Sequence, residues 1–142
     1  MPIDPTRVEM KITGDPRLVG AVIAAVEHFA QGAEMDDARQ KQLMAAAEQA
    51  CLETFNRLDT EGTPIDVTLE LFPDRLEIAF AHASSEGPAL GLDSFLSLDD
   101  NSGPSHGAML MTLVDRVLYD SAGGQSTMRL VKYLTPAGGK PQ

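Results

Sequence analysis

Residues 110–134, LMTLVDRVLYDSAGGQSTMRLVKYL, decide the fold class of this chain. The apolar residues at the start of this stretch follow helical spacing, which predicts a helix from Gly107 to about Arg116. The apolar residues then alternate along 117–120 and 126–134, which is the period of strands. A Gly123-Gly124 pair between two such runs is typical of a tight hairpin turn. We therefore predict that the chain closes with a helix and a β-hairpin.

Toward the N-terminus, the same two periods predict three further strands and two further helices. Asp15 and Asp36 suit the N-caps of these helices, and Gly32 suits the C-terminal cap of the first. The order is strand, two helices, two strands, a long loop, one helix and two strands. This order predicts an α+β fold: a two-layer α/β sandwich with three helices on one face of a mixed, mostly antiparallel sheet of about five strands. The additional elements are strands 7–13, 65–71 and 76–80 and helices 16–31 and 36–58.

The length of 142 residues suits one domain, which we place at 7–134, followed by a flexible tail at 135–142. The segment 83–105 holds six serines and three glycines and has little periodicity. A loop of this length in a compact domain is usually a lid, a binding loop or a disordered segment.

The formal net charge is −10, from 21 acidic and 11 basic residues. Such a surface repels phosphate backbones, so we expect no nucleic-acid partner. It suits a basic protein partner through electrostatic steering, although solubility alone would also account for it. We expect a cytoplasmic protein without membrane contact, because the sequence has no secretory leader and no apolar run near 18 residues. The single cysteine, Cys51, lies among apolar helix positions and is expected to be buried and unreactive.

The helix over 42–58 has an unusual polar side. At about 100° per residue, Gln49, Glu53 and Asn56 share one side, whereas the opposite side is apolar. Exposed helix surfaces normally carry Lys and Glu. Two amides and one carboxylate beside Leu52 instead indicate a partly covered surface.

These elements and the residues of 110–134 resemble the anti-sigma-factor serine/threonine kinases of bacterial partner-switching systems, which belong to the histidine-kinase-like (GHKL) ATPase superfamily. Glu48-Gln-Ala-Cys-Leu-Glu53 and the Asp-Pro helix start also look like the opening of that family. The resemblance covers roughly residues 7–134. It implies a sigma factor or a STAS-domain anti-sigma antagonist as partner, and it makes a homodimer through the first strand and first helix plausible.

The first family motif, E-A-x-x-N on the second helix, supplies a general base and a ligand for the magnesium that bridges the nucleotide phosphates. Aligning Ala50-Cys51 with the family's common Ala-Cys puts Gln49 at the base position and Glu53 at the metal position. Gln49 is no useful base, but Glu53 retains an oxygen for magnesium. Using Glu48 as the base instead places Leu52 at the metal position.

Two further nucleotide motifs of the family are also altered. The aspartate that accepts a hydrogen bond from adenine is replaced by His82. The glycine-rich phosphate loop reads Gly103-Pro-Ser-His-Gly107, in which the proline removes an amide donor. Gly103, His106 and Gly107 are the residues of that loop at motif positions. Thr127 stands where the family often has a threonine on its last strand.

The preferred interpretation is a regulator that acts by protein contact and needs no cofactor, because three ligand motifs are altered together within an intact fold pattern. One alternative is an active kinase that uses Mg-ATP, with Glu53 as metal ligand and Glu48 as base. A second alternative is a remodelled pocket that holds a metal or a small ligand, for which His82, His106 and Glu53 are the candidate metal ligands.

Overall fold

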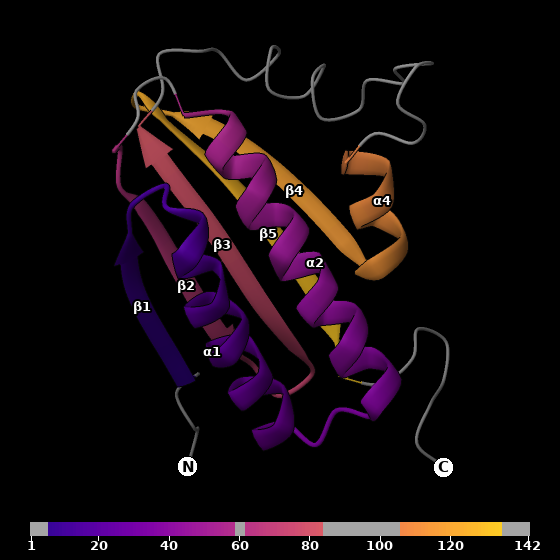
Figure 1. The fold of residues 1–142 in the computed structure, drawn as a ribbon. Coiled ribbons are helices and arrows are strands. Elements are labelled where there is room, and N and C mark those ends of the chain that lie inside the picture. The colour runs from indigo at the N-terminus through magenta and orange to yellow at the C-terminus, as the bar shows by residue number, and fades with distance from the viewer. Residues whose placement is uncertain (1–5, 59–61, 84–105, 135–142) are drawn as a thin grey trace.

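The computed structural model describes residues 6–58, 62–83 and 106–134. Its centre is a five-stranded sheet of order β1-β2-β3-β5-β4 (Figure 1). Each of the four pairings is antiparallel, so the sheet that the sequence predicts as mostly antiparallel is wholly so in this part of the chain. The strands are β1 (Thr6–Ile12), β2 (Ile65–Leu71), β3 (Arg75–Ala83), β4 (Arg116–Ala122) and β5 (Gln125–Tyr133).

Three helices lie on one face of this sheet, which confirms the two-layer α+β class (Figure 1). They are α1 (Val19–Gly32), which follows a short 3-10 turn at Pro16–Leu18, α2 (Asp37–Asn56) and α4 (His106–Leu113). Among these helices, α2 packs against both α1 and α4. None of the described helices is long and apolar enough to cross a membrane.

Local sequence signals explain the starts of two helical segments. The carboxylate of Asp15 accepts a hydrogen bond from the backbone amide of Arg17. The carboxylate of Asp36 accepts one from the backbone amide of Arg39 at 2.8 Å, so both predicted N-caps are confirmed. The prediction for Gly32 is wrong. The helix continues through this glycine, the C-cap is Ala33, and the left-handed turn falls on Glu34, whose φ is 61°.

The closing hairpin forms as predicted, with Gly123 and Gly124 both at positive φ in the turn. The preceding helix is shorter than expected. It ends at Leu113 rather than near Arg116, because the Asp115 amide already donates to the Val131 carbonyl and the backbone has joined the sheet.

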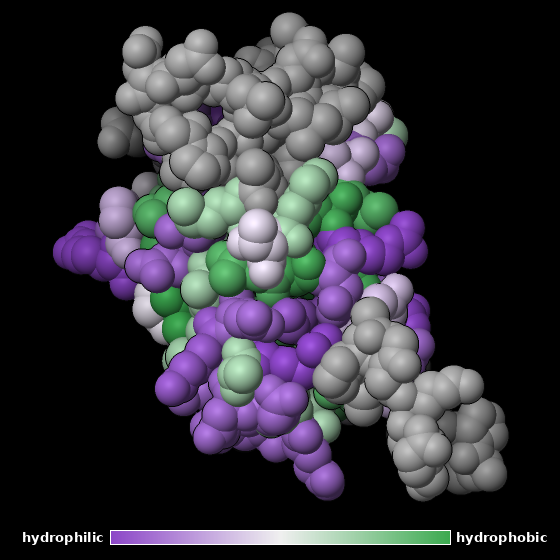
Figure 2. Space-filling view, turned by 90° about the vertical axis from the view of Figure 1, so that its right-hand side faces the viewer, coloured by the Kyte–Doolittle hydropathy of each residue, from purple (hydrophilic) through white to green (hydrophobic). Residues whose placement is uncertain are grey.

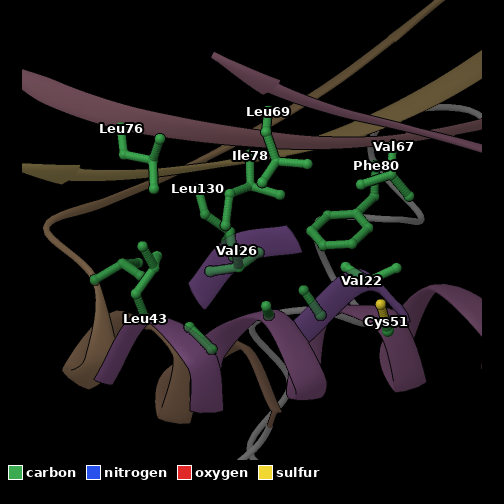
Figure 3. Packing of buried hydrophobic residues seen from close by; sticks show 14 of the residues in the cluster. Val22, Val26, Leu43, Cys51, Val67, Leu69, Leu76, Ile78, Phe80 and Leu130 are labelled. Atoms are coloured by element: carbon green, nitrogen blue, oxygen red, sulfur yellow. The ribbon is translucent and has the colours of Figure 1, made fainter. Parts of the chain in front are cut away.

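Strand alternation divides the sheet into a helix-covered face and an open face. The covered face supplies the core, where Phe80, Ile78 and Leu69 meet Val22 and Val26 of α1 and Leu43 and Cys51 of α2 (Figure 3). Cys51 is buried, as expected from its apolar surroundings. Burial raises the pKa of its thiol to about 12, with a smaller contribution from Glu48. The open face carries cross-strand ion pairs, including Arg7 with Glu70 and Arg129 with Glu77.

Candidate functional site

A small hollow lies where the C-terminal half of α2 meets one end of the sheet. The end of β3, the start of β5 and the middle of β4 form its floor. The space between the side chains is too narrow to admit a water molecule. The residues that line it are Thr54, Arg57, Phe80, His82, Tyr119, Ser126, Thr127 and Met128.

A buried ion pair borders the hollow on α2. The Arg57 Nε donates to Glu53 Oε2 at 2.8 Å, and the two side chains are only 8% and 9% exposed. The guanidinium also lies 5.4 Å from the centre of the Tyr119 ring, and its Nη1 donates weakly to the Tyr119 hydroxyl at 3.4 Å. Glu53, the predicted metal ligand, therefore already has a cation as its partner.

The remaining guanidinium nitrogen of Arg57, Nη2, is buried and has no hydrogen-bond acceptor in the described part of the chain. A buried polar hydrogen without an acceptor is rare, and it is destabilising unless water or a ligand satisfies it. Among the described atoms of the site, Nη2 is thus a buried donor that calls for a further polar group.

The other predicted α2 residues differ in their exposure. Gln49 is half-buried, whereas Glu48 and Asn56 are exposed. Glu48 lies about 140° around the helix from Glu53. The negative charge of Glu48 instead contributes to the raised pKa of the Cys51 thiol. The two acids considered for an active kinase therefore point to different sides of α2.

His82 is the last residue but one of β3, and it is buried. Its Nδ1 is 3.0 Å from the Ala83 carbonyl oxygen, so Nδ1 donates its hydrogen to that oxygen. In the β3–β5 register His82 is opposite Ser126, which is also buried. Thr127 is opposite Ala81 on the open face, so the side chain of Ser126, rather than that of Thr127, lies on the same face of the sheet as His82.

The remaining predicted site residues cannot be placed as side chains. Gly103 lies outside the described residues. His106 and Gly107 form the start of α4, but only their backbone is described. Among the described side chains, no group of three His, Cys, Asp or Glu is arranged to hold a metal ion. The combination of His82, His106 and Glu53 therefore stays a prediction.

Sequence reasoning missed Arg57, Tyr119, Thr54 and Ser126. The spacing of Glu53 and Arg57, four residues apart on a helix, is the signal that could have suggested their pairing. Counting alternate residues back from Met128 places Ser126 on the inner face. No local pattern indicates Tyr119, because its position depends on how β4 aligns with β5.

Comparison with known proteins bears on the fold. No family model matches the chain, and no curated protein matches it. Its structure is similar to the crystal structure of the RsbU and RsbW domains of Rv1364c from Mycobacterium tuberculosis, with a TM-score of 0.64 and 11% sequence identity. The match covers 89% of this chain and 32% of the solved chain, so this chain spans about a third of that length. At this identity the match establishes a shared fold.

Proposed function

We propose that this chain is an anti-sigma-factor-like regulatory domain that acts by binding another protein, with tight binding of Mg-ATP lost. By resemblance, its partner is a sigma factor or a STAS-domain anti-sigma antagonist in the cytoplasm. Nucleic acid and membrane are not part of this proposal.

The observation that carries the proposal is the ion pair of Glu53 and Arg57. In the resembled family this helix position presents a neutral amide to magnesium. Here a carboxylate takes the position and is bound by an internal guanidinium. A magnesium ion at Glu53 would compete with Arg57 for the carboxylate. If it displaced Arg57, it would leave that charge buried without a partner, which is strongly unfavourable.

Two further observations support the proposal. The solved structure similar in fold contains a domain named RsbW, and the resemblance found in the sequence is to kinases of that kind. The net charge of −10 favours association with a basic protein surface.

Calorimetric titration with Mg-ATP is the direct test, with AMP and Mg²⁺ alone as controls. We expect no binding tighter than about 1 mM, a free energy of about −4 kcal/mol. The triple variant Gln49→Glu, Glu53→Asn, Arg57→Ala is the matched comparison, because it returns both family residues and removes the internal cation. Micromolar binding by the natural chain would overturn the loss of nucleotide binding.

Partner binding is tested separately with any sigma factor and any STAS-domain protein that are encoded beside this gene. A stable complex in size-exclusion chromatography without nucleotide is expected with one of the two proteins. Incubation with labelled ATP tests the kinase alternative, and phosphate transfer that Glu53→Ala abolishes would establish that alternative instead.

A small polar ligand is the second candidate function, and Arg57 Nη2 favours it. Because the hollow as it stands does not admit a water molecule, such a ligand requires the side chains around it to move apart. A ligand that brings an oxygen acceptor would satisfy this buried donor. Retention of such a compound through native purification, seen by mass spectrometry and lost in Arg57→Met, is the expected signature.

A further inference from the structure

An apolar pocket opens to solvent where the C-terminal half of α1 meets the start of β1 and the end of β2, at the lower end of these elements in Figure 1. We call it the α1 pocket. The residues that line it are Thr6, His28, Phe29, Gly32 and Leu71. Its volume is about 130 Å³, and most of its lining atoms are apolar. Because an apolar cavity of about 150 Å³ can bind benzene, the α1 pocket has room for one aliphatic side chain of the size of leucine.

Gly32 keeps the α1 pocket open, although neither the backbone conformation nor the packing requires a glycine at this position. It is the last residue of α1, and its φ is not in the left-handed region that favours glycine. A Cβ atom there would have no neighbouring atom within 4 Å. Glycine destabilises a helix relative to alanine, so the missing side chain has a cost for α1. Its effect is free space beside Phe29 and Leu71.

Exposed carboxylates flank the α1 pocket. Glu27 directly precedes His28 in α1. Glu34 follows Gly32 by two residues, and both glutamates are exposed. Within the described residues, no Lys, Arg or His forms an ion pair with either of them. Such carboxylates repel acidic groups that approach the pocket and attract basic ones, so the α1 pocket combines an apolar interior with negatively charged surroundings.

The large hydrophobic side chains that are exposed elsewhere in the described residues do not form a comparable surface. They are Met109, Met111 and Leu118. Figure 2 shows hydrophobic residues across the middle of the side on which α4 lies. However, Met109 and Met111 are about 160° apart around α4. Leu118 lies on the open face of the sheet, away from the helices. Single exposed hydrophobic residues of this kind are normal in soluble proteins.

We propose that the α1 pocket binds an aliphatic side chain from a basic segment of a partner protein, with Lys or Arg residues of that segment beside Glu27 and Glu34. This inference rests on the proposed function and deepens it, because it names the surface that the basic partner contacts. Burial of the aliphatic group provides affinity, and the carboxylates select the charge of the residues on either side of it. A second copy of this chain is a less suitable occupant, since it would bring a net charge of −10 to the same carboxylates.

A short synthetic peptide tests the α1 pocket without the natural partner. The sequence Lys-Lys-Leu-Lys-Lys, with blocked ends, presents one aliphatic side chain between basic residues. In a titration followed by NMR, the backbone amide signals of Phe29, Gly32 and Leu71 should shift and saturate. The peptide Lys-Lys-Ala-Lys-Lys has the same charge and a smaller apolar group, so its Kd should be about tenfold higher, which corresponds to about 1.4 kcal/mol. The peptide Glu-Glu-Leu-Glu-Glu should bind at least about tenfold more weakly, because its charge is reversed.

Variants of the chain separate the α1 pocket from the general negative charge. Gly32→Leu places a side chain in the pocket and should abolish the difference between the two basic peptides. Gly20→Leu is the matched control. It adds the same side chain to the same helix, about 18 Å along its axis, at a position where a Cβ atom also has no neighbouring atom within 4 Å. Circular dichroism confirms that each variant is folded.

Charge reversal at the edge of the pocket tests the role of the carboxylates. Glu27→Lys should raise the Kd of the Leu-containing basic peptide by about threefold, the effect of one exposed ion pair. Glu48→Lys makes the same change at an exposed position of α2 and should raise this Kd less.

The same variants show whether a natural partner uses this surface. In a complex with a sigma factor or a STAS-domain protein, Gly32→Leu should raise the Kd by about tenfold or more, whereas Gly20→Leu should leave it unchanged. An unchanged Kd with Gly32→Leu would overturn this inference and leave the proposed function intact. Binding of the Leu-containing basic peptide without binding of either protein would contradict the proposed function alone.

Three other results would overturn the inference. One is an equal Kd for the Leu-containing and Ala-containing basic peptides. Another is a set of NMR shifts that excludes Phe29, Gly32 and Leu71. The third is a dimer of this chain that Gly32→Leu dissociates, which would assign the α1 pocket to a second copy.

Discussion

Replacement of Arg57 by Met tests whether the ion pair beside the hollow is a structural element. Methionine preserves most of the aliphatic packing but removes the cation, so the Glu53 carboxylate stays in a site where it is 9% exposed. Removing one partner of a buried ion pair typically costs about 3–5 kcal/mol, since the remaining charge is desolvated without compensation. This is a large share of the roughly 5–15 kcal/mol by which natural domains are stable.

Urea unfolding followed by circular dichroism measures the effect. With a slope of about 2 kcal/mol per molar, a loss of 4 kcal/mol lowers the midpoint by about 2 M. The double variant Glu53→Met, Arg57→Met should recover most of this loss, because a buried ion pair replaced by apolar groups of similar volume is often nearly neutral. Arg17→Met is the control, since the Arg17–Asp15 pair is exposed and its loss should leave the midpoint unchanged.

A loss of less than about 1 kcal/mol on Arg57→Met alone, the value of an ordinary surface pair, would contradict a structural role for the ion pair. A double variant no more stable than Arg57→Met would contradict it as well. In that case the lost contacts with Tyr119, rather than the unpaired charge, would account for the loss.

Three other predictions concern residues away from the hollow. Lys132 is buried, its Nζ donates to Gln42 and to the Leu113 carbonyl, and desolvation lowers its pKa from the ordinary 10.5. In the pH range just below 10.5, the unfolded chain therefore binds more protons at Lys132 than the folded chain does. The stability of the natural chain, measured relative to Lys132→Met by urea unfolding, should rise with pH in that range. A constant or falling difference between the two proteins would contradict the direction of the pKa shift. Because the pKa of Cys51 is about 12, only about one part in ten thousand of its thiol is ionised at pH 8. A thiol reagent should therefore label it only when the chain unfolds. Labelling of the native chain within seconds would refute its burial. Asp36→Ala removes the N-cap of α2 and should lower stability by about 1 kcal/mol in thermal or urea unfolding, whereas no change would mean that the cap hydrogen bond is not formed in solution.

The fold followed from the sequence because its signals are local. Alternation marked the strands, two aspartates marked the helix starts, and Gly123-Gly124 marked the hairpin turn. Helix ends were less predictable, since they depend on competition with tertiary contacts. Gly32 has the right chemistry for a cap, yet α1 runs one residue further, and α4 stops early because Asp115 hydrogen-bonds to β5.

The site was less predictable because it depends on distant contacts. By resemblance, the sequence predicts that Gln49, Glu53 and His82 are altered motif positions, and this stays a prediction. The charge that acts on Glu53 comes from Arg57, which no motif contains. Thr127 fits the family pattern by its place in the sequence, whereas the register turns Ser126 inward. Motif matching locates positions along the chain, and the partner of each side chain is set by the packing of separate elements.

The arrangement of α2 is compatible with the proposed function, in which the fold is kept and nucleotide chemistry is lost. The residues that anchor the helix to the sheet, such as Leu43, Ala47 and Cys51, lie on a different side from Glu53. Substitutions around the hollow therefore leave the core intact, but they must still balance charge, because a buried carboxylate without a cation is strongly destabilising. Arg57 provides that balance. Returning Glu53 to Asn by itself should consequently fail to create a magnesium site, since it would leave the Arg57 guanidinium buried, unpaired and repelling the metal; both residues must change together.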